Sequence, residues 1–131
     1  MLMANRSQEW LKQAERVLDL AKISAEAGHF EWACFAAQQS AEKAVKALHL
    51  SEGEEAWGHV IARLLKALPY KVPRALVKKA MTLDGYYIAP RYPNSHAEGA
   101  PFEHFSDLQS KQAIKYAREI LDFARSQMAQ T

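Results

Sequence analysis

The sequence has little cysteine and no long apolar run. Its single cysteine, Cys34, cannot form an internal disulfide or a zinc cluster, which favours a reducing compartment. No apolar run approaches the ~20 residues that a membrane-spanning helix needs, and the N-terminus has no signal-peptide h-region. We therefore predict a cytoplasmic protein without a membrane span. Residues 32–36 are largely apolar, so Cys34 is expected to be a buried thiol.

The chain also carries little excess charge of either sign. The formal net charge is +2 and the sequence pI is about 8.7, which permits an anionic partner but does not require one. Hydrophobic residues make up 49% and charged residues 24% of the chain, a balance typical of globular proteins rather than disordered ones. A length of 131 residues is enough for one sizeable core, and we predict a single domain over residues 1–131.

No segment alternates convincingly with the period of a β-strand, and no internal repeat is present. Apolar residues instead recur at intervals of three and four, the spacing of amphipathic helices. Gly28 is expected to end the first helix, Pro73 to begin the fourth, and Ser106 with Gln109 to form a capping box for the last. The predicted helices span residues 7–27, 30–50, 58–68, 73–86 and 106 onward. This pattern predicts an all-α protein, an antiparallel four-helix up-and-down bundle with a short additional helix.

The second predicted helix combines many alanines with a polar interruption at residues 38–43. Apolar residues surround much of its first half, so it is expected to be the most buried helix, and its polar groups must find partners or face a cleft. Glu42, Lys43 and Lys46 are open to two interpretations. They line a ligand cleft, or the lysines extend to solvent while Glu42 pairs with Lys46 one turn later.

The irregular region from residue 88 to 105 concentrates side chains suited to a nucleotide or RNA. Arg91 can hold a phosphate with a planar fork of donors, His96 can transfer a proton near neutral pH, and tyrosines can stack on bases. A structural interpretation stands beside this one. Tyr86, Tyr87 and Tyr92 would close the end of the bundle, and Arg91 would bond loop carbonyls.

The remaining histidines carry weaker signals. His29 and His49 lie near helix ends and are expected to be solvated or capping, and His59 is a candidate cap of the short helix. No histidine pair has the spacing of an H-E-x-x-H metal site, and there is no Gly-rich phosphate loop and no Ser-His-Asp arrangement. We predict neither a metal site nor a cofactor.

Three pieces of the sequence resemble the HEPN domain family, in the same order along the chain. They are the helix at residues 35–48, with Gln38-Gln39-Ser40-Ala41-Glu42-Lys43 at its centre, the pair Gly58-His59, and the segment at residues 83–93. The resemblance covers nearly the whole chain. The combination of the second helix with the Arg91-Tyr92-Pro93 loop is fairly specific, whereas either alone is weak.

The resemblance implies a helical bundle that pairs into a homodimer. Many HEPN proteins are encoded beside a minimal nucleotidyltransferase and form a toxin–antitoxin pair with it. Many are metal-independent ribonucleases, whose composite site carries an arginine, four to six intervening residues and then a histidine, contributed by both protomers. Here Arg91 and His96 match that spacing, with the arginine expected to steady a phosphate and the histidine to transfer a proton.

Three functional hypotheses follow. In the first, a dimer binds a nucleotide or RNA and works with a minimal nucleotidyltransferase. In the second, it is an RNA endonuclease with Arg91 and His96 as catalytic residues. In the third, it is a non-catalytic helical adaptor. The expected ligand-binding residues are Tyr87, Arg91, Tyr92, Asn94, Gln39, Glu42, Lys43 and Lys46.

Overall fold

The computed structural model describes residues 5–130, and over this range it contains helices and no strand. The α-helices are α1 (Ser7–Glu26), α2 (Phe30–Ser51), α3 (Ile61–Lys66), α4 (Arg74–Asp84) and α5 (Asp107–Met128). Two 3-10 turns, η1 (Pro93–Ser95) and η2 (Pro101–His104), interrupt the long loop before α5. None of the helices within residues 5–130 is long and apolar enough to cross a membrane.

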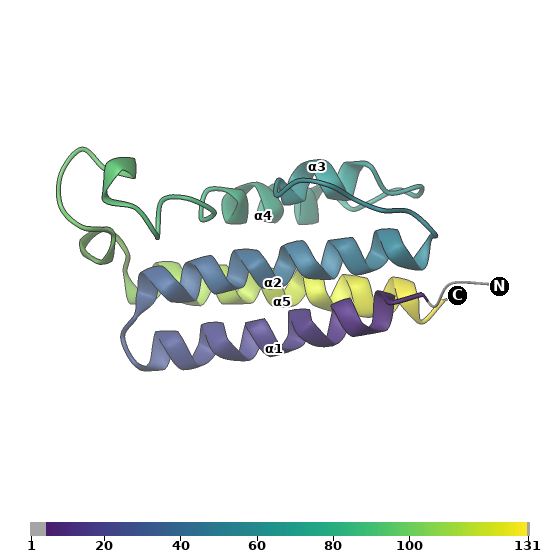
Figure 1. The fold of residues 1–131 in the computed structure, drawn as a ribbon, viewed down its shortest axis with the longest axis horizontal. Coiled ribbons are helices and arrows are strands. Elements are labelled where there is room, and N and C mark those ends of the chain that lie inside the picture. The colour runs from purple at the N-terminus through teal and green to yellow at the C-terminus, as the bar shows by residue number, and fades with distance from the viewer. Residues whose placement is uncertain (1–4, 131) are drawn as a thin grey trace.

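The four longer helices alternate in direction, as Figure 1 shows. Helices α1, α2 and α5 lie side by side, and the short α3 and α4 form a layer above α2. The predicted all-α, up-and-down bundle with a short additional helix is therefore confirmed. The loop from α4 to α5 extends beyond the end of α2 where that helix begins.

Helix α2 lies at the centre of the bundle because its small residues let its neighbours approach closely. Its fully buried alanines are Ala33, Ala37, Ala41, Ala44 and Ala47. The buried hydroxyl of Ser40 donates a 2.7 Å hydrogen bond to the carbonyl of Ala14 in α1, so the polar group costs little. Cys34 is buried as predicted, and burial, helped by the charge of Glu31, raises the pKa of its thiol to about 12.

Two helix boundaries form as the sequence predicts. Gly28 adopts φ +85° between α1 and α2, a conformation that glycine reaches without steric cost. At the start of α5 the Ser106 hydroxyl accepts from the Gln109 backbone N–H, and the Gln109 side chain accepts from the Ser106 N–H, both at 3.2 Å. This reciprocal capping box fixes where the long loop ends.

Other boundaries differ from the prediction. Helix α3 begins at Ile61 rather than residue 58, because the Asp84 carboxylate at the end of α4 accepts from the N–H groups of Ile61 and Ala62, at 2.6 and 3.1 Å. Pro73 precedes α4 as its N-cap residue rather than starting the helix. Proximity in sequence could not reveal the cap on α3, since its acceptor comes from a helix more than twenty residues away.

The prediction that His49 is solvated or capping was wrong. Its side chain is buried, with 4% of the residue exposed. Nε2 donates to the carbonyl of Leu64 at 2.8 Å, and Nδ1 lies 3.2 Å from a carboxylate oxygen of Glu54. The ring therefore joins the end of α2 to α3. His29 is exposed at the other end of α2, as expected.

Candidate functional site

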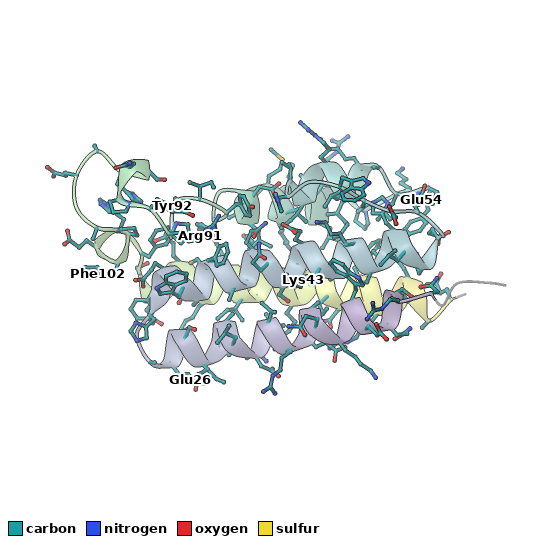
Figure 2. The ribbon with its side chains drawn as sticks, viewed as in Figure 1. Glu26, Lys43, Glu54, Arg91, Tyr92 and Phe102 are labelled. Carbon is teal, nitrogen blue, oxygen red and sulfur yellow. The ribbon has the colours of Figure 1, made fainter. Side chains whose placement is uncertain are left out.

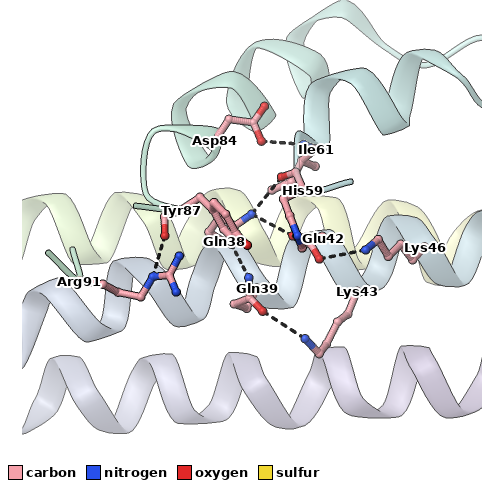
Figure 3. A network of polar contacts seen from close by, with 10 residues as sticks. All are labelled: Gln38, Gln39, Glu42, Lys43, Lys46, His59, Ile61, Asp84, Tyr87 and Arg91. Atoms are coloured by element: carbon pink, nitrogen blue, oxygen red, sulfur yellow. Dashed lines mark hydrogen bonds and ion pairs between the residues drawn. The ribbon is translucent and has the colours of Figure 1, made fainter. Parts of the chain in front are cut away.

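A polar face of α2 lies beneath the α3–α4 layer and the start of the long loop (Figure 3). Gln38 and Glu42 are buried, whereas Gln39, Lys43 and Lys46 are half-buried. These residues recur at three- and four-residue intervals, which places them along one side of the helix. The polar interruption seen in the sequence is therefore a continuous polar face.

The amides of this face are joined by hydrogen bonds. Lys43 Nζ donates to Gln39 Oε1 at 3.3 Å, and Gln39 Nε2 donates to Gln38 Oε1 at 2.8 Å. Gln38 Nε2 then donates to Glu42 Oε1 and to the backbone carbonyl of His59, both at 3.3 Å. Both the oxygen and the nitrogen of the buried Gln38 amide therefore have hydrogen-bond partners. Through Gln39, this amide connects Lys43 with the buried carboxylate of Glu42.

The Glu42 carboxylate has a cationic and an aromatic partner. Lys46 Nζ lies 3.1 Å from Oε2, so the predicted Glu42–Lys46 pair is present. His59 Nδ1 lies 3.0 Å from Oε1, although His59 was considered only as a helix cap. The side chain of Glu42 is 6% exposed and that of His59 is 52% exposed, so the imidazole bridges the buried carboxylate and solvent.

Arg91 lies among three aromatic rings at the start of α2. Its guanidinium carbon is 4.4 Å from the ring centre of Phe35, 4.8 Å from that of Tyr87 and 5.2 Å from that of Tyr92. Nε donates to the Tyr87 carbonyl at 2.8 Å, as the structural interpretation expected. Within residues 5–130 the two terminal nitrogens have no hydrogen-bond partner, so two donor groups remain for a ligand. Figure 2 shows Arg91 and Tyr92 between the loop and this end of α2.

The two neighbouring tyrosines have different roles. Tyr86 packs against the core and Phe105, and burial raises the pKa of its hydroxyl. Tyr87 instead stacks on the His59 ring, with centroids 4.5 Å apart and planes 16° apart. Since Tyr87 also contacts Arg91, its ring connects the arginine with the Glu42–His59 pair. The structural interpretation therefore suits Tyr86, whereas Tyr87 belongs to the polar site.

The structure does not connect every predicted site residue. Asn94 is exposed in η1. His96 Nε2 donates to the Ala89 carbonyl at 2.8 Å, and its ring stacks on His104 at 4.2 Å. In the part of the chain described, no hydrogen bond or ring contact joins Asn94 or His96 to Arg91. The residues brought together are Tyr87, Arg91, Tyr92, Gln39, Glu42, Lys43 and Lys46.

Sequence reasoning did not assign Phe35, Gln38 and His59 to the site. Phe35 lies one turn before Gln39 on α2, so helical spacing could have added it. His59 reaches Glu42 only because α3 folds back over α2. The available signal was that Gly58-His59, the second helix and the loop were the three pieces that carried the family resemblance. Across residues 5–130 no three His, Cys, Asp or Glu side chains are grouped closely enough to hold a metal.

Known proteins share this architecture. A family model described as HEPN domain matches residues 7–127. The chain is 25% identical over 124 residues to a Methanocaldococcus jannaschii protein named "Putative toxin MJ1304", a match covering 86% of this chain and 82% of the relative.

Solved structures match still more of the chain. The crystal structure of TT1696 from Thermus thermophilus is 46% identical with a TM-score of 0.92, covering 94% of this chain and 98% of that one. ST0689, described as an archaeal HEPN homologue, is 38% identical with a TM-score of 0.83, covering 95% and 99%. A HEPN domain protein from Thermotoga maritima, TM0613, is 30% identical with a TM-score of 0.78, covering 94% and 99%. The chain therefore belongs to the HEPN domain family.

Proposed function

We propose that this chain binds the phosphate of an RNA or nucleotide at the surface formed by Tyr87, Arg91, Tyr92 and the polar face of α2. In this proposal it works as a homodimer with a minimal nucleotidyltransferase in a toxin–antitoxin-like pair. The toxin name of the archaeal relative supports the toxin-like role, and the homodimer and the nucleotidyltransferase partner are what the family resemblance implies. The observation that carries the first part is the aromatic enclosure of Arg91.

The enclosure of Arg91 prepares the side chain for an anion. Three rings and the Nε hydrogen bond hold the guanidinium in one orientation, so little conformational entropy remains to be lost on binding. The free terminal nitrogens match two oxygens of a phosphate. Tyr92, which is 49% exposed, offers a ring on which a base can stack.

The charges around this surface favour the same ligand. Arg91, Lys43 and Lys46 are cationic, and of these three Glu42 pairs with Lys46. Lys43 bonds only a neutral amide oxygen in the described part of the chain, so its charge is not neutralised by a carboxylate. A positive surface with adjacent aromatic rings is typical of sites for single-stranded nucleic acid.

Removing the Arg91 side chain should weaken binding. We expect Arg91→Ala to reduce the affinity for a fluorescently labelled single-stranded RNA about 10- to 100-fold, since hydrogen bonds to charged groups contribute about 1.5–3 kcal/mol. The measurement is fluorescence anisotropy at fixed ionic strength, repeated at higher salt to test for phosphate contacts. Arg118→Ala, which removes an exposed arginine on α5, is the matched control and should bind as wild type does.

Equal affinity of Arg91→Ala and wild type would contradict the proposed site. It would favour the adaptor hypothesis, in which the polar residues of α2 serve packing alone. The dimer is tested separately by light scattering coupled to gel filtration. The partnership is tested by co-purification with a minimal nucleotidyltransferase encoded beside the chain.

A further inference from the structure

We propose that His59, oriented by Glu42, is the proton-transfer residue for metal-independent cleavage of RNA held at Arg91. This inference rests on the proposed function, because it requires RNA to bind at that surface. It places the chemistry at the Glu42–His59 pair rather than at His96. The argument starts from the hydrogen-bonding pattern of Glu42.

The contacts of Glu42 define the tautomer of His59. Oε1 lies 3.0 Å from His59 Nδ1 and 3.3 Å from Gln38 Nε2, and Oε2 lies 3.1 Å from Lys46 Nζ. A carboxylate surrounded by donors accepts at both oxygens, so His59 Nδ1 carries a hydrogen. In the neutral ring Nε2 then holds the lone pair, as a general base requires.

The position of the ring also suits proton transfer. Nε2 has no partner among the described residues, and half of the side chain is exposed, so the lone pair is accessible to a ligand. Tyr87 stacks on the imidazole and contacts Arg91, so one ring links the preoriented base with the phosphate-binding group (Figure 3). His96 lacks such an arrangement, since its Nε2 hydrogen is given to the Ala89 carbonyl and no carboxylate bonds its ring within residues 5–130.

The reaction that fits these groups is transesterification within the RNA. His59 Nε2 removes the proton of a ribose 2′-hydroxyl, the 2′-oxygen bonds to the adjacent phosphorus, and the bond from phosphorus to the 5′-oxygen breaks. Water protonates the leaving 5′-oxygen, and the resulting hydroxide takes the proton from the imidazolium. The products are a 2′,3′-cyclic phosphate and a 5′-hydroxyl. Arg91 would stabilise charge on the phosphate oxygens.

The test is cleavage of a defined single-stranded RNA in EDTA, with products identified by mass spectrometry. We expect wild type to cleave, and His59→Ala to lose about 10²–10⁴-fold in rate while retaining RNA affinity and thermal stability. His96→Ala and His29→Ala should keep the wild-type rate. A substrate with 2′-hydrogen in place of the 2′-hydroxyl should bind without being cleaved.

The positioning role of Glu42 has its own readout. Glu42→Gln replaces the anionic acceptor of the Nδ1 hydrogen with a neutral amide, so it should lower kcat while leaving KM and the affinity for RNA unchanged. A wild-type kcat in Glu42→Gln would overturn the positioning role of Glu42. Loss of cleavage in His96→Ala but not in His59→Ala would overturn the assignment of His59.

The inference and the proposed function fail differently. Binding without any cleavage by wild type, at high protein concentration, overturns the inference and leaves the proposed binding function standing. Absence of both binding and cleavage overturns both.

Discussion

Replacing Lys46 with methionine is expected to lower the free energy of unfolding by about 3–5 kcal/mol, the usual cost of removing one partner from a buried ion pair. The side chains of Lys46 and Glu42 are 15% and 6% exposed, so water has little access to the carboxylate to replace its interaction with the ammonium group. Methionine retains the aliphatic packing of the lysine stem but leaves the carboxylate with only Gln38 and His59. The measurement is urea unfolding at pH 8, followed by circular dichroism.

Two variants separate this ion pair from a general effect of losing lysine. In the double variant Glu42→Gln with Lys46→Met, most of the lost stability should return, because no unpaired buried charge remains. Lys111→Met removes the partner of Asp107 at the same i,i+4 spacing on an exposed part of α5, and it should cost below about 1 kcal/mol. Equal, small effects at positions 46 and 111 would show that Glu42 is not shielded from water.

Replacing Asp84 with leucine is expected to cost about 1–3 kcal/mol for each of the two backbone N–H groups that it leaves without an acceptor. Those groups belong to Ile61 and Ala62 at the start of α3. Since this cap fixes the segment that carries His59, the variant should also weaken the His59–Glu42 contact. Thermal unfolding measures the first effect, and the chemical shifts of the His59 ring measure the second. Asp84→Asn retains one acceptor and should be intermediate.

The pH dependence of stability gives an independent check on the burial of the Asp84 carboxyl. Burial raises the pKa of its carboxyl, with the charge of Glu42 acting in the same direction and the Ile61 and Ala62 N–H groups opposing it. The native state therefore keeps the proton to a higher pH than the unfolded chain does. The free energy of unfolding should fall as the pH rises from the ordinary pKa of an aspartate to the raised pKa of Asp84. Asp84→Leu should lose that dependence. An unchanged dependence in Asp84→Leu would contradict the account.

The helices were predictable because their signals are local. The spacing of apolar residues, Gly28 and the Ser106–Gln109 pair act within a few residues of the structure that they determine. The start of α3 was not predictable, because its cap comes from Asp84 in another helix. The burial of His49 was missed for the same reason, since the Leu64 carbonyl reaches it only after α3 folds onto α2.

The site was predictable in composition but not in connectivity. Residue chemistry singled out Arg91 and the polar residues of α2, and the structure joins them through Tyr87. The family resemblance instead implied a pairing of Arg91 with His96, on the spacing of the family motif. The fold gives His96 a different set of partners, the Ala89 carbonyl and the ring of His104. Spacing alone could not distinguish these possibilities, because the loop conformation depends on contacts with α2.

The central claim is that Arg91 and its aromatic neighbours hold the phosphate of a nucleic acid ligand. It is tested most directly by a crystal structure of the protein with a dinucleotide whose 2′-hydroxyl is replaced by hydrogen, so that it cannot be cleaved. We expect a phosphate within hydrogen-bonding distance of the Arg91 terminal nitrogens and a base stacked on Tyr92. A ligand bound at another face, with Arg91 still enclosed and unpartnered, would contradict the account.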